Sequence, residues 1–390
     1  MASGATAEKA KPAWGVFPVM VLVILAGEAV ASALGLDPAA KVGVLEAREV
    51  EGLLDAVLPA SVSAELVTWS GFLLAGLAAS LVVLAGLVVP REKGLRASIG
   101  AGLVVTAMLL LAWAVSGQGI LTGIATGLIM FLSSLAARQG GALGAMGNFA
   151  GTLYFLFAIL GVTDDLQASG LKAAGVIVEL SLVGSVVGIA ALVLLHYVRV
   201  VTGWRVIPER KSAPAPQNDP KPDPIPFFAR GPALRYAIVR GLLLGVSMGL
   251  YQETGSHTIF WVMLAIWVVL QPVRSKTWEK AAKRGIGILI GCLLVAAVAS
   301  VVSGAALIWL ALGLLLVGFA YYPVNYAVFV ACLSFLVVAI YGDASQSGIV
   351  HWGLQRVLDN AIGITIALLC AYLVLPDEDK AGRPKEPATP

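Results

Sequence analysis

Four ionisable residues lie within or at the ends of long apolar stretches: Glu28, Glu179, Arg240 and Asp359. Charges in such stretches are costly to bury, so each is a functional candidate by default. Arg240 keeps its charge and presents a planar fork that matches a carboxylate. Burial of Glu28 would disfavour its charged form and let it carry a proton near neutral pH. These residues are therefore candidates for binding an anion and for carrying protons.

Each of these candidates also has a structural alternative, and the sequence leaves both open. Glu28 could be a protonated glutamate packed between helices. Asp359 lies one helical turn after Arg356 and could simply pair with it. Arg240 could form an ion pair with an acid on a neighbouring helix.

Aromatic and amide side chains near these charges could complete a binding site. Trp261 and Trp267 offer faces on which a flat aromatic ring would stack, and Tyr326 is a further candidate. Tryptophan and tyrosine also gather at membrane interfaces without any binding role. Asn325 could cap or bridge a broken helix near the site, or hold two helices together. These four residues and Arg240 are the predicted substrate-binding set.

The composition predicts which elements must position these residues. Of 390 residues, 59% are hydrophobic and 13% are charged, against about 25% charged in a soluble protein. The chain is therefore predicted to be an all-α integral membrane protein. A membrane-spanning helix needs about 20 apolar residues. Twelve candidate spans lie near 14–36, 67–89, 97–116, 118–137, 146–163, 173–198, 235–251, 258–271, 284–303, 305–321, 325–341 and 357–375.

Lysine and arginine predict the orientation of these spans. They gather in the predicted inner loops, while the outer stretch 37–66 is acidic. In this pattern Arg356 falls outside the last span, and Arg240 is the one cation well inside a span. We expect both termini in the cytoplasm and localisation in the inner membrane. A cleaved N-terminal signal peptide is the alternative, but Glu28 within the apolar run argues against it.

A proline-rich stretch divides the chain into two halves. The predicted domains are a first membrane repeat at 1–202, a cytoplasmic linker at 203–232, a second membrane repeat at 233–376 and a cytoplasmic tail at 377–390. Polar positions recur between the halves: Asn148 matches Asn325, and Glu179 matches Asp359. Matched elements share their predicted direction, which favours two parallel six-helix repeats. The alternative is a chance alignment of low-complexity helices.

Four ordered stretches of the second half carry a resemblance to a known family. They are 232–240 (PALRYAIVR), 260–272 (FWVMLAIWVVLQP), 283–291 (KRGIGILIG), and Asn325-Tyr326 joined with Arg356-Val-Leu-Asp359-Asn360-Ala-Ile-Gly363. The order and spacing resemble the FUSC family, the fusaric acid resistance and aromatic acid exporter group. This chain departs from that pattern at Asn360, where threonine is usual, and lacks the sizeable cytoplasmic domains of many members.

The resemblance implies an inner-membrane exporter of aromatic carboxylic acids, driven by the proton gradient. Partners implied by the resemblance are a small organic anion, protons and a periplasmic adaptor protein. Membrane lipid and a second copy of the chain are further expected partners. Plant aluminium-activated malate channels look distantly similar, so a passive anion channel is an alternative. A non-transporting membrane scaffold is another.

Other functional classes find no support in the sequence. Three histidines and no Cys/His cluster predict no metal site. No nucleotide-binding loop is present, and no cofactor is expected. A net charge of +3 on an apolar chain does not suit a nucleic-acid binder. Enzymatic catalysis is not expected.

Overall fold

In the structure, a computed structural model, the regular elements of the described residues are helices. The structure describes residues 14–34, 73–88, 91–139, 141–159, 171–202, 228, 231–342 and 346–375, and no strand occurs among them. The twelve helices of this part are α1 (Val16–Ala33), α5 (Leu73–Val88), α6 (Arg91–Val115), α7 (Gly119–Arg138), α8 (Gly141–Ile159), α9 (Leu171–Thr202), α10 (Pro232–Thr254), α11 (His257–Val269), α12 (Arg274–Val298), α13 (Ala305–Tyr321), α14 (Tyr326–Tyr341) and α15 (Gln346–Val374).

Six of these helices are long and apolar enough to cross a membrane: α6, α7, α9, α10, α12 and α15. The others are shorter apolar helices. The predicted all-α membrane protein is therefore confirmed. The number of crossings, the two parallel repeats and the domain boundaries stay predictions. The outer stretch 37–66 and most of the linker lie outside the described residues.

Two helices of the second half begin well before the predicted spans. Helix α12 begins at Arg274 rather than at 284, and α15 begins at Gln346 rather than at 357. Hydropathy marks where a helix is apolar, whereas a helix continues through polar residues that favour helical geometry. Arg356, predicted to lie outside the last span, is therefore inside α15. Asp359 lies near the middle of α15 and not near its outer end.

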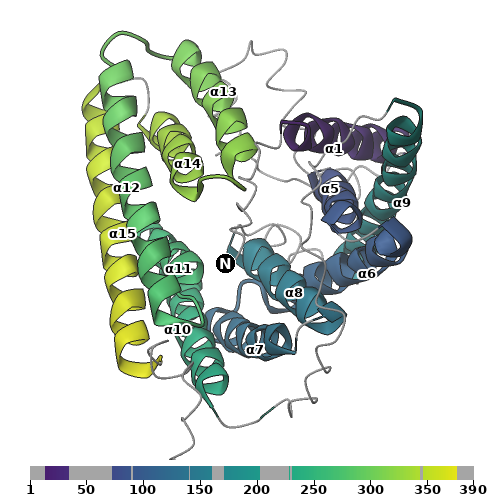
Figure 1. The fold of residues 1–390 in the computed structure, drawn as a ribbon, viewed down its shortest axis with the longest axis horizontal. Coiled ribbons are helices and arrows are strands. Elements are labelled where there is room, and N and C mark those ends of the chain that lie inside the picture. The colour runs from purple at the N-terminus through teal and green to yellow at the C-terminus, as the bar shows by residue number, and fades with distance from the viewer. Residues whose placement is uncertain are drawn as a thin grey trace, which may run out of the picture.

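The two halves of the chain form two groups of helices that meet mainly at α7 and α10 (Figure 1). Six glycines let these two helices approach closely. A Cβ on Gly123 would lie 2.8 Å from the carbonyl oxygen of Gly245, and a Cβ on Gly241 would lie 2.7 Å from that of Gly127. The pairing shows that α7 and α10 run antiparallel, as their predicted directions require.

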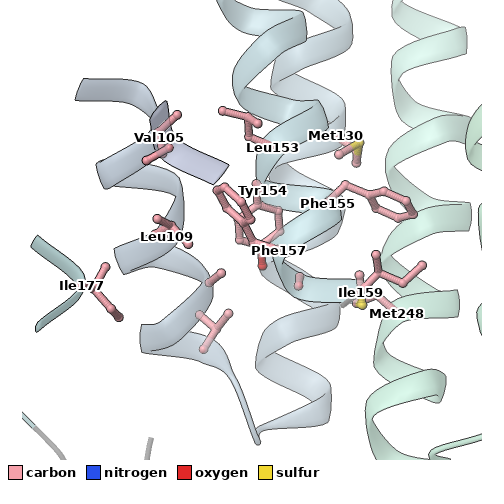
Figure 2. Packing of buried hydrophobic residues seen from close by; sticks show 14 of the residues in the cluster. Val105, Leu109, Met130, Leu153, Tyr154, Phe155, Phe157, Ile159, Ile177 and Met248 are labelled. Atoms are coloured by element: carbon pink, nitrogen blue, oxygen red, sulfur yellow. The ribbon is translucent and has the colours of Figure 1, made fainter. Parts of the chain in front are cut away.

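The largest apolar core of the described residues takes side chains from α1 and from every helix between α5 and α11. Tyr154, Phe155 and Phe157 of α8 fill its centre (Figure 2). Met130 of α7 and Met248 of α10 extend the same core into the second half. The core therefore joins the two halves of the chain.

Corresponding helices pack in corresponding pairs within the two halves. Helix α5 packs on α9 as α11 packs on α15, and α8 packs on α6 and α7 as α14 packs on α12 and α13. The matched glycines Gly184 and Gly363 both meet a backbone carbonyl of the partner helix, at Ala75 and Val262. This agreement is what a duplication would produce.

Candidate functional site

Three charged side chains are buried in the second half, and they carry the candidate site. Arg284 of α12 is 5% exposed, and Arg356 and Asp359 of α15 are 4% and 3% exposed. No other charged residue in the described part of the chain is buried to this degree. Burying charge costs several kcal/mol unless partners compensate it. Their placement therefore calls for a function or a dense set of partners.

The helices that hold these residues are locked together locally. Helices α12 and α15 run side by side, and α11 and α14 pack against this pair (Figure 1). Between α11 and α12, the Thr277 hydroxyl accepts a hydrogen bond from the Gln271 backbone N–H at 3.1 Å. Pro272 lies in this turn and cannot donate to a helix. This turn between α11 and α12 sets the position of Trp261 on α11 relative to Arg284 on α12.

Arg284 ties three helices together. Its Nε donates to Oδ1 of Asn360 on α15 at 3.0 Å, and its Nη1 donates to the Tyr326 hydroxyl on α14 at 3.2 Å. The Asn360 Nδ2 in turn donates to the carbonyl oxygen of Arg356 at 2.9 Å. Both amide atoms of Asn360 are thus used, and its orientation is fixed by the network.

Arg356 is stacked but incompletely hydrogen-bonded. Its guanidinium carbon lies 3.8 Å from the ring centroid of Trp261. Its Nε and Nη1 are buried without a hydrogen-bond partner. Stacking covers a face of the guanidinium and leaves its edge, where the N–H groups point, able to bind an acceptor. A planar oxyanion such as a carboxylate fits that edge.

Asp359 lies one helical turn from Arg356 and also keeps an unused atom. Its carboxylate interacts with the hydroxyl of Thr258 on α11. Its Oδ2 is buried without a hydrogen-bond partner. Arg356 and Asp359 line the same small cavity, which has about 10 Å³ of room for the centre of a water molecule, roughly what one water needs. The remaining lining residues are Trp261, Val337, Val338, Tyr341, Trp352 and Gln355.

Aromatic and basic groups continue this cluster at both ends. His257, Tyr341 and Trp352 contact one another beside the cavity, with ring centroids 5.2 to 6.1 Å apart. At the other end, the Lys280 ammonium lies 4.1 Å from the ring centroid of Tyr326. Polar and aromatic groups therefore form a line along α15 and α12 through the second half.

The buried charges of this line do not balance. Arg284 and Arg356 supply two positive charges, and Asp359 supplies one negative charge. Lys280 adds a further, partly buried positive charge. A low-dielectric site with excess positive charge favours an anion.

The structure brings three of the predicted site residues into this cluster: Trp261, Tyr326 and Asp359. It also explains Asn325, which is the N-cap of α14 and whose Oδ1 accepts from the Ala327 N–H at 3.0 Å. Asn325 is exposed and orients the helix that carries Tyr326.

Arg240 and Trp267 lie elsewhere, where the two halves meet. Arg240 Nη1 donates to the Ser134 hydroxyl of α7 at 3.3 Å, and its Nε is buried without a hydrogen-bond partner. Trp267 stacks on Phe155 of α8, with centroids 4.9 Å apart. Neither contacts the cluster around Arg356 in these interactions, and their roles in substrate binding stay predictions.

The other two predicted proton carriers lie on helices of the first half. Glu28 lies in α1, but its side chain is outside the described residues. Glu179 lies in α9 of the first half with an exposed side chain. Their proton-carrying roles stay predictions as well.

Sequence reasoning missed Arg284, Arg356 and Asn360 as site residues. Arg284 belongs to a basic run that also fits the inner-loop pattern, and Arg356 stands just before a predicted span. Besides Arg240 in α10, the structure places Arg284 and Arg356 well inside α12 and α15, because both helices begin before the predicted spans. The sequence did contain a signal for Arg284, Arg356 and Asn360, since all three belong to the ordered stretches that resemble the family.

Comparison with known proteins agrees with that resemblance. Residues 241–370 match the family described as fusaric acid resistance protein-like. The match covers about a third of the chain and includes Trp261, Arg284, Tyr326, Arg356 and Asp359. Comparison with curated proteins and with solved structures gave no match. The match and the six long apolar helices together indicate a multi-pass membrane protein.

Proposed function

We propose that this protein is a secondary exporter of organic anions, with aromatic carboxylates as the leading substrate class. The observation that carries the proposal is the excess of buried positive charge at Arg284 and Arg356. The description of the matched family supports a membrane transporter of the resistance type. Transport rather than catalysis is the function of this cluster.

In this proposal Arg356 binds the substrate carboxylate. Its unpartnered N–H groups supply a fork that fits two carboxylate oxygens, and the charge is strengthened by burial. Trp261 already stacks on the guanidinium, and Trp352 lines the same cavity. These rings suit an aromatic substrate, because offset stacking adds about 0.5–1.5 kcal/mol beyond the buried area. The cavity must widen to admit such a ring, so binding involves movement between α11, α14 and α15.

Arg240 is proposed as a second anion contact, nearer the cytoplasm. Its unpartnered Nε supports this role, although Ser134 already accepts from its Nη1. With both termini in the cytoplasm and the protein in the inner membrane, α10 would begin on the cytoplasmic side. An anion would then meet Arg240 before Arg356.

The driving force is proposed to be the proton gradient. Glu28, Glu179 and Asp359 are the acids proposed to carry protons during the cycle. Exchange of an outgoing anion for an incoming proton would let the gradient drive export.

A passive anion channel is the second candidate, and one observation favours it. The line from Lys280 through Arg284 and Arg356 to His257 runs through a single half of the chain. Anion pores use lysine and arginine side chains to select their ions, and three such side chains lie along this line. Flux through a channel would follow the membrane potential and would not require a pH gradient.

Efflux of labelled 4-hydroxybenzoate from preloaded cells tests the proposal. Cells that contain the protein should lose the label faster than cells without it. Collapse of this difference after addition of a protonophore would support proton-driven export. Efflux that persists and follows membrane potential would support the channel. Equal efflux with and without correctly inserted protein would contradict transport of this substrate class.

A further inference from the structure

The relation between Arg356 and Asp359 extends the proposed function and rests on it. Both side chains line one small cavity. Each keeps buried atoms without a hydrogen-bond partner there, Nε and Nη1 on Arg356 and Oδ2 on Asp359. A bidentate pair between the two would use Oδ2 of Asp359 and either Nε or Nη1 of Arg356, and all three atoms lack a partner. The pair is therefore close enough to interact by charge, but its hydrogen-bonding groups are open to a third group.

From this geometry we infer that a proton on Asp359 and an anion on Arg356 bind cooperatively. The ionised carboxylate of Asp359 offsets the charge of Arg356 and repels a second carboxylate in the same cavity. When a proton from solution adds to that carboxylate, the group becomes neutral and both effects disappear. The charge of Arg284, Arg356 and Asp359 together rises from +1 to +2. An anion then meets a more positive site.

The other groups around the pair do not reverse this relation. Thr258 of α11 interacts with Asp359 and is neutral. Tyr341 of α14 and Cys292 of α12 lie within electrostatic range of Arg356 and are ordinarily neutral near pH 7.

The remaining charged neighbours add only positive charge. Arg284 of α12 strengthens the anion preference. His257 of α11 is a titratable group beside Tyr341 and Trp352. Helix α10 also touches α15, and its Arg240 donates to Ser134 of α7.

Cooperative binding of proton and anion changes what Asp359 contributes to transport. Exchange of a proton for an anion requires a site where the two exclude each other. At the Arg356 cavity each favours the other, so Asp359 acts as an acid-sensitive switch on anion binding. A proton that is exchanged for the anion must be carried elsewhere, and Glu28 and Glu179 are the acids predicted for that role.

Binding of labelled benzenesulfonate to the purified full chain in nanodiscs tests this. The probe stays anionic across the range, so a change in affinity reports on the protein. Between about pH 8 and pH 5 we expect wild-type affinity to rise by roughly 5–150-fold, the usual size of coupling between linked sites. Asp359→Asn should bind tightly at both pH values, and Asp359→Glu should keep the pH dependence.

A second readout separates a switch from a merely structural role for Asp359. In weakly buffered solution near neutral pH, anion binding should take up protons in the wild type, because linkage is reciprocal. The Asp359→Asn variant should take up fewer. His257→Gln serves as the matched variant for the nearby histidine and should keep most of the pH dependence.

The outcomes distinguish this inference from the proposed function. Probe binding that is independent of pH, or weaker in acid, would overturn the inference and leave anion transport standing. A wild-type pH dependence in folded Asp359→Asn would also overturn the inference alone. Absence of probe binding by the wild type at every pH would overturn both.

Discussion

The guanidinium of Arg356 on α15 lies 3.8 Å from the ring centroid of Trp261 on α11. This stack joins α15, which also carries the buried acid Asp359, to α11. It places a permanent cation and an aromatic face on one small cavity. Both features are what an aromatic carboxylate requires from a binding site.

Replacement of Trp261 tests the aromatic side of this stack. Trp261→Leu should weaken binding of 4-hydroxybenzoate by roughly 2–10-fold, the worth of one aromatic contact. Binding of an aliphatic carboxylate should change much less. Competition binding with both ligands measures the difference. Trp309→Leu, at an exposed position of α13, is the control. Equal losses for both ligands would mean that Trp261 positions Arg356 without touching the substrate ring.

Loss of the Asn360 amide should destabilise the second half. Asn360→Ala removes the acceptor of Arg284 Nε and the donor to the Arg356 carbonyl. Leaving buried polar groups unpaired costs about 1–3 kcal/mol each. Thermal unfolding in detergent should show a lower Tm. Thr365→Ala on the same helix, where the hydroxyl is exposed and bonds within the helix, should change Tm little. A similar Tm for both variants would contradict the network.

The contact between α7 and α10 should be intolerant of side chains. Gly245→Leu would place its Cβ 2.8 Å from the carbonyl oxygen of Gly123, so the two helices must separate. Overpacking costs about 1–3 kcal/mol or more. Gly313→Leu is the matched control, because nothing lies within 4 Å of a Cβ at that glycine. Unfolding measurements should show destabilisation for Gly245→Leu and none for Gly313→Leu. Equal stability of the Gly245→Leu and Gly313→Leu variants would mean that the contact between α7 and α10 does not hold the halves together.

Arg240 offers a separate test of the proposed cytoplasmic contact. Arg240→Gln should lower efflux by about tenfold or more if a charge-assisted hydrogen bond to the substrate is lost. The measurement is 4-hydroxybenzoate efflux normalised to the amount of correctly inserted protein. Arg235→Gln, exposed on the same helix, is the control. Unchanged efflux for Arg240→Gln would remove Arg240 from the anion path and leave it as a contact to Ser134.

The sequence predicts the helical class and the family resemblance because both depend on local patterns. Apolar stretches of membrane length predict helices, and the ordered motifs of the second half carry the resemblance. Helix ends are harder, since α12 and α15 continue through polar residues such as Arg274 and Gln346. Because both helices begin earlier than predicted, Arg284 and Arg356 lie inside helices and not before them.

The site itself depends on contacts that no local pattern contains. Arg284, Tyr326 and Asn360 come from three helices, and their hydrogen bonds are visible only after packing. Trp261 and Asp359 were found from sequence because a tryptophan motif and a charge in an apolar stretch are unusual locally. Arg240 was found by the same reasoning, although the fold places it at the contact between the halves.

The measurement that tests the central claim most directly is transport by Arg356→Gln. Purified protein in liposomes, loaded with labelled 4-hydroxybenzoate, should release it at a protein-dependent rate. Arg356→Gln should lower this rate by at least about tenfold, because the substrate loses a charge-assisted fork. Arg96→Gln, at an exposed position of α6, should release the label as the wild type does. A wild-type rate for folded Arg356→Gln would contradict the assignment of anion binding to this cluster.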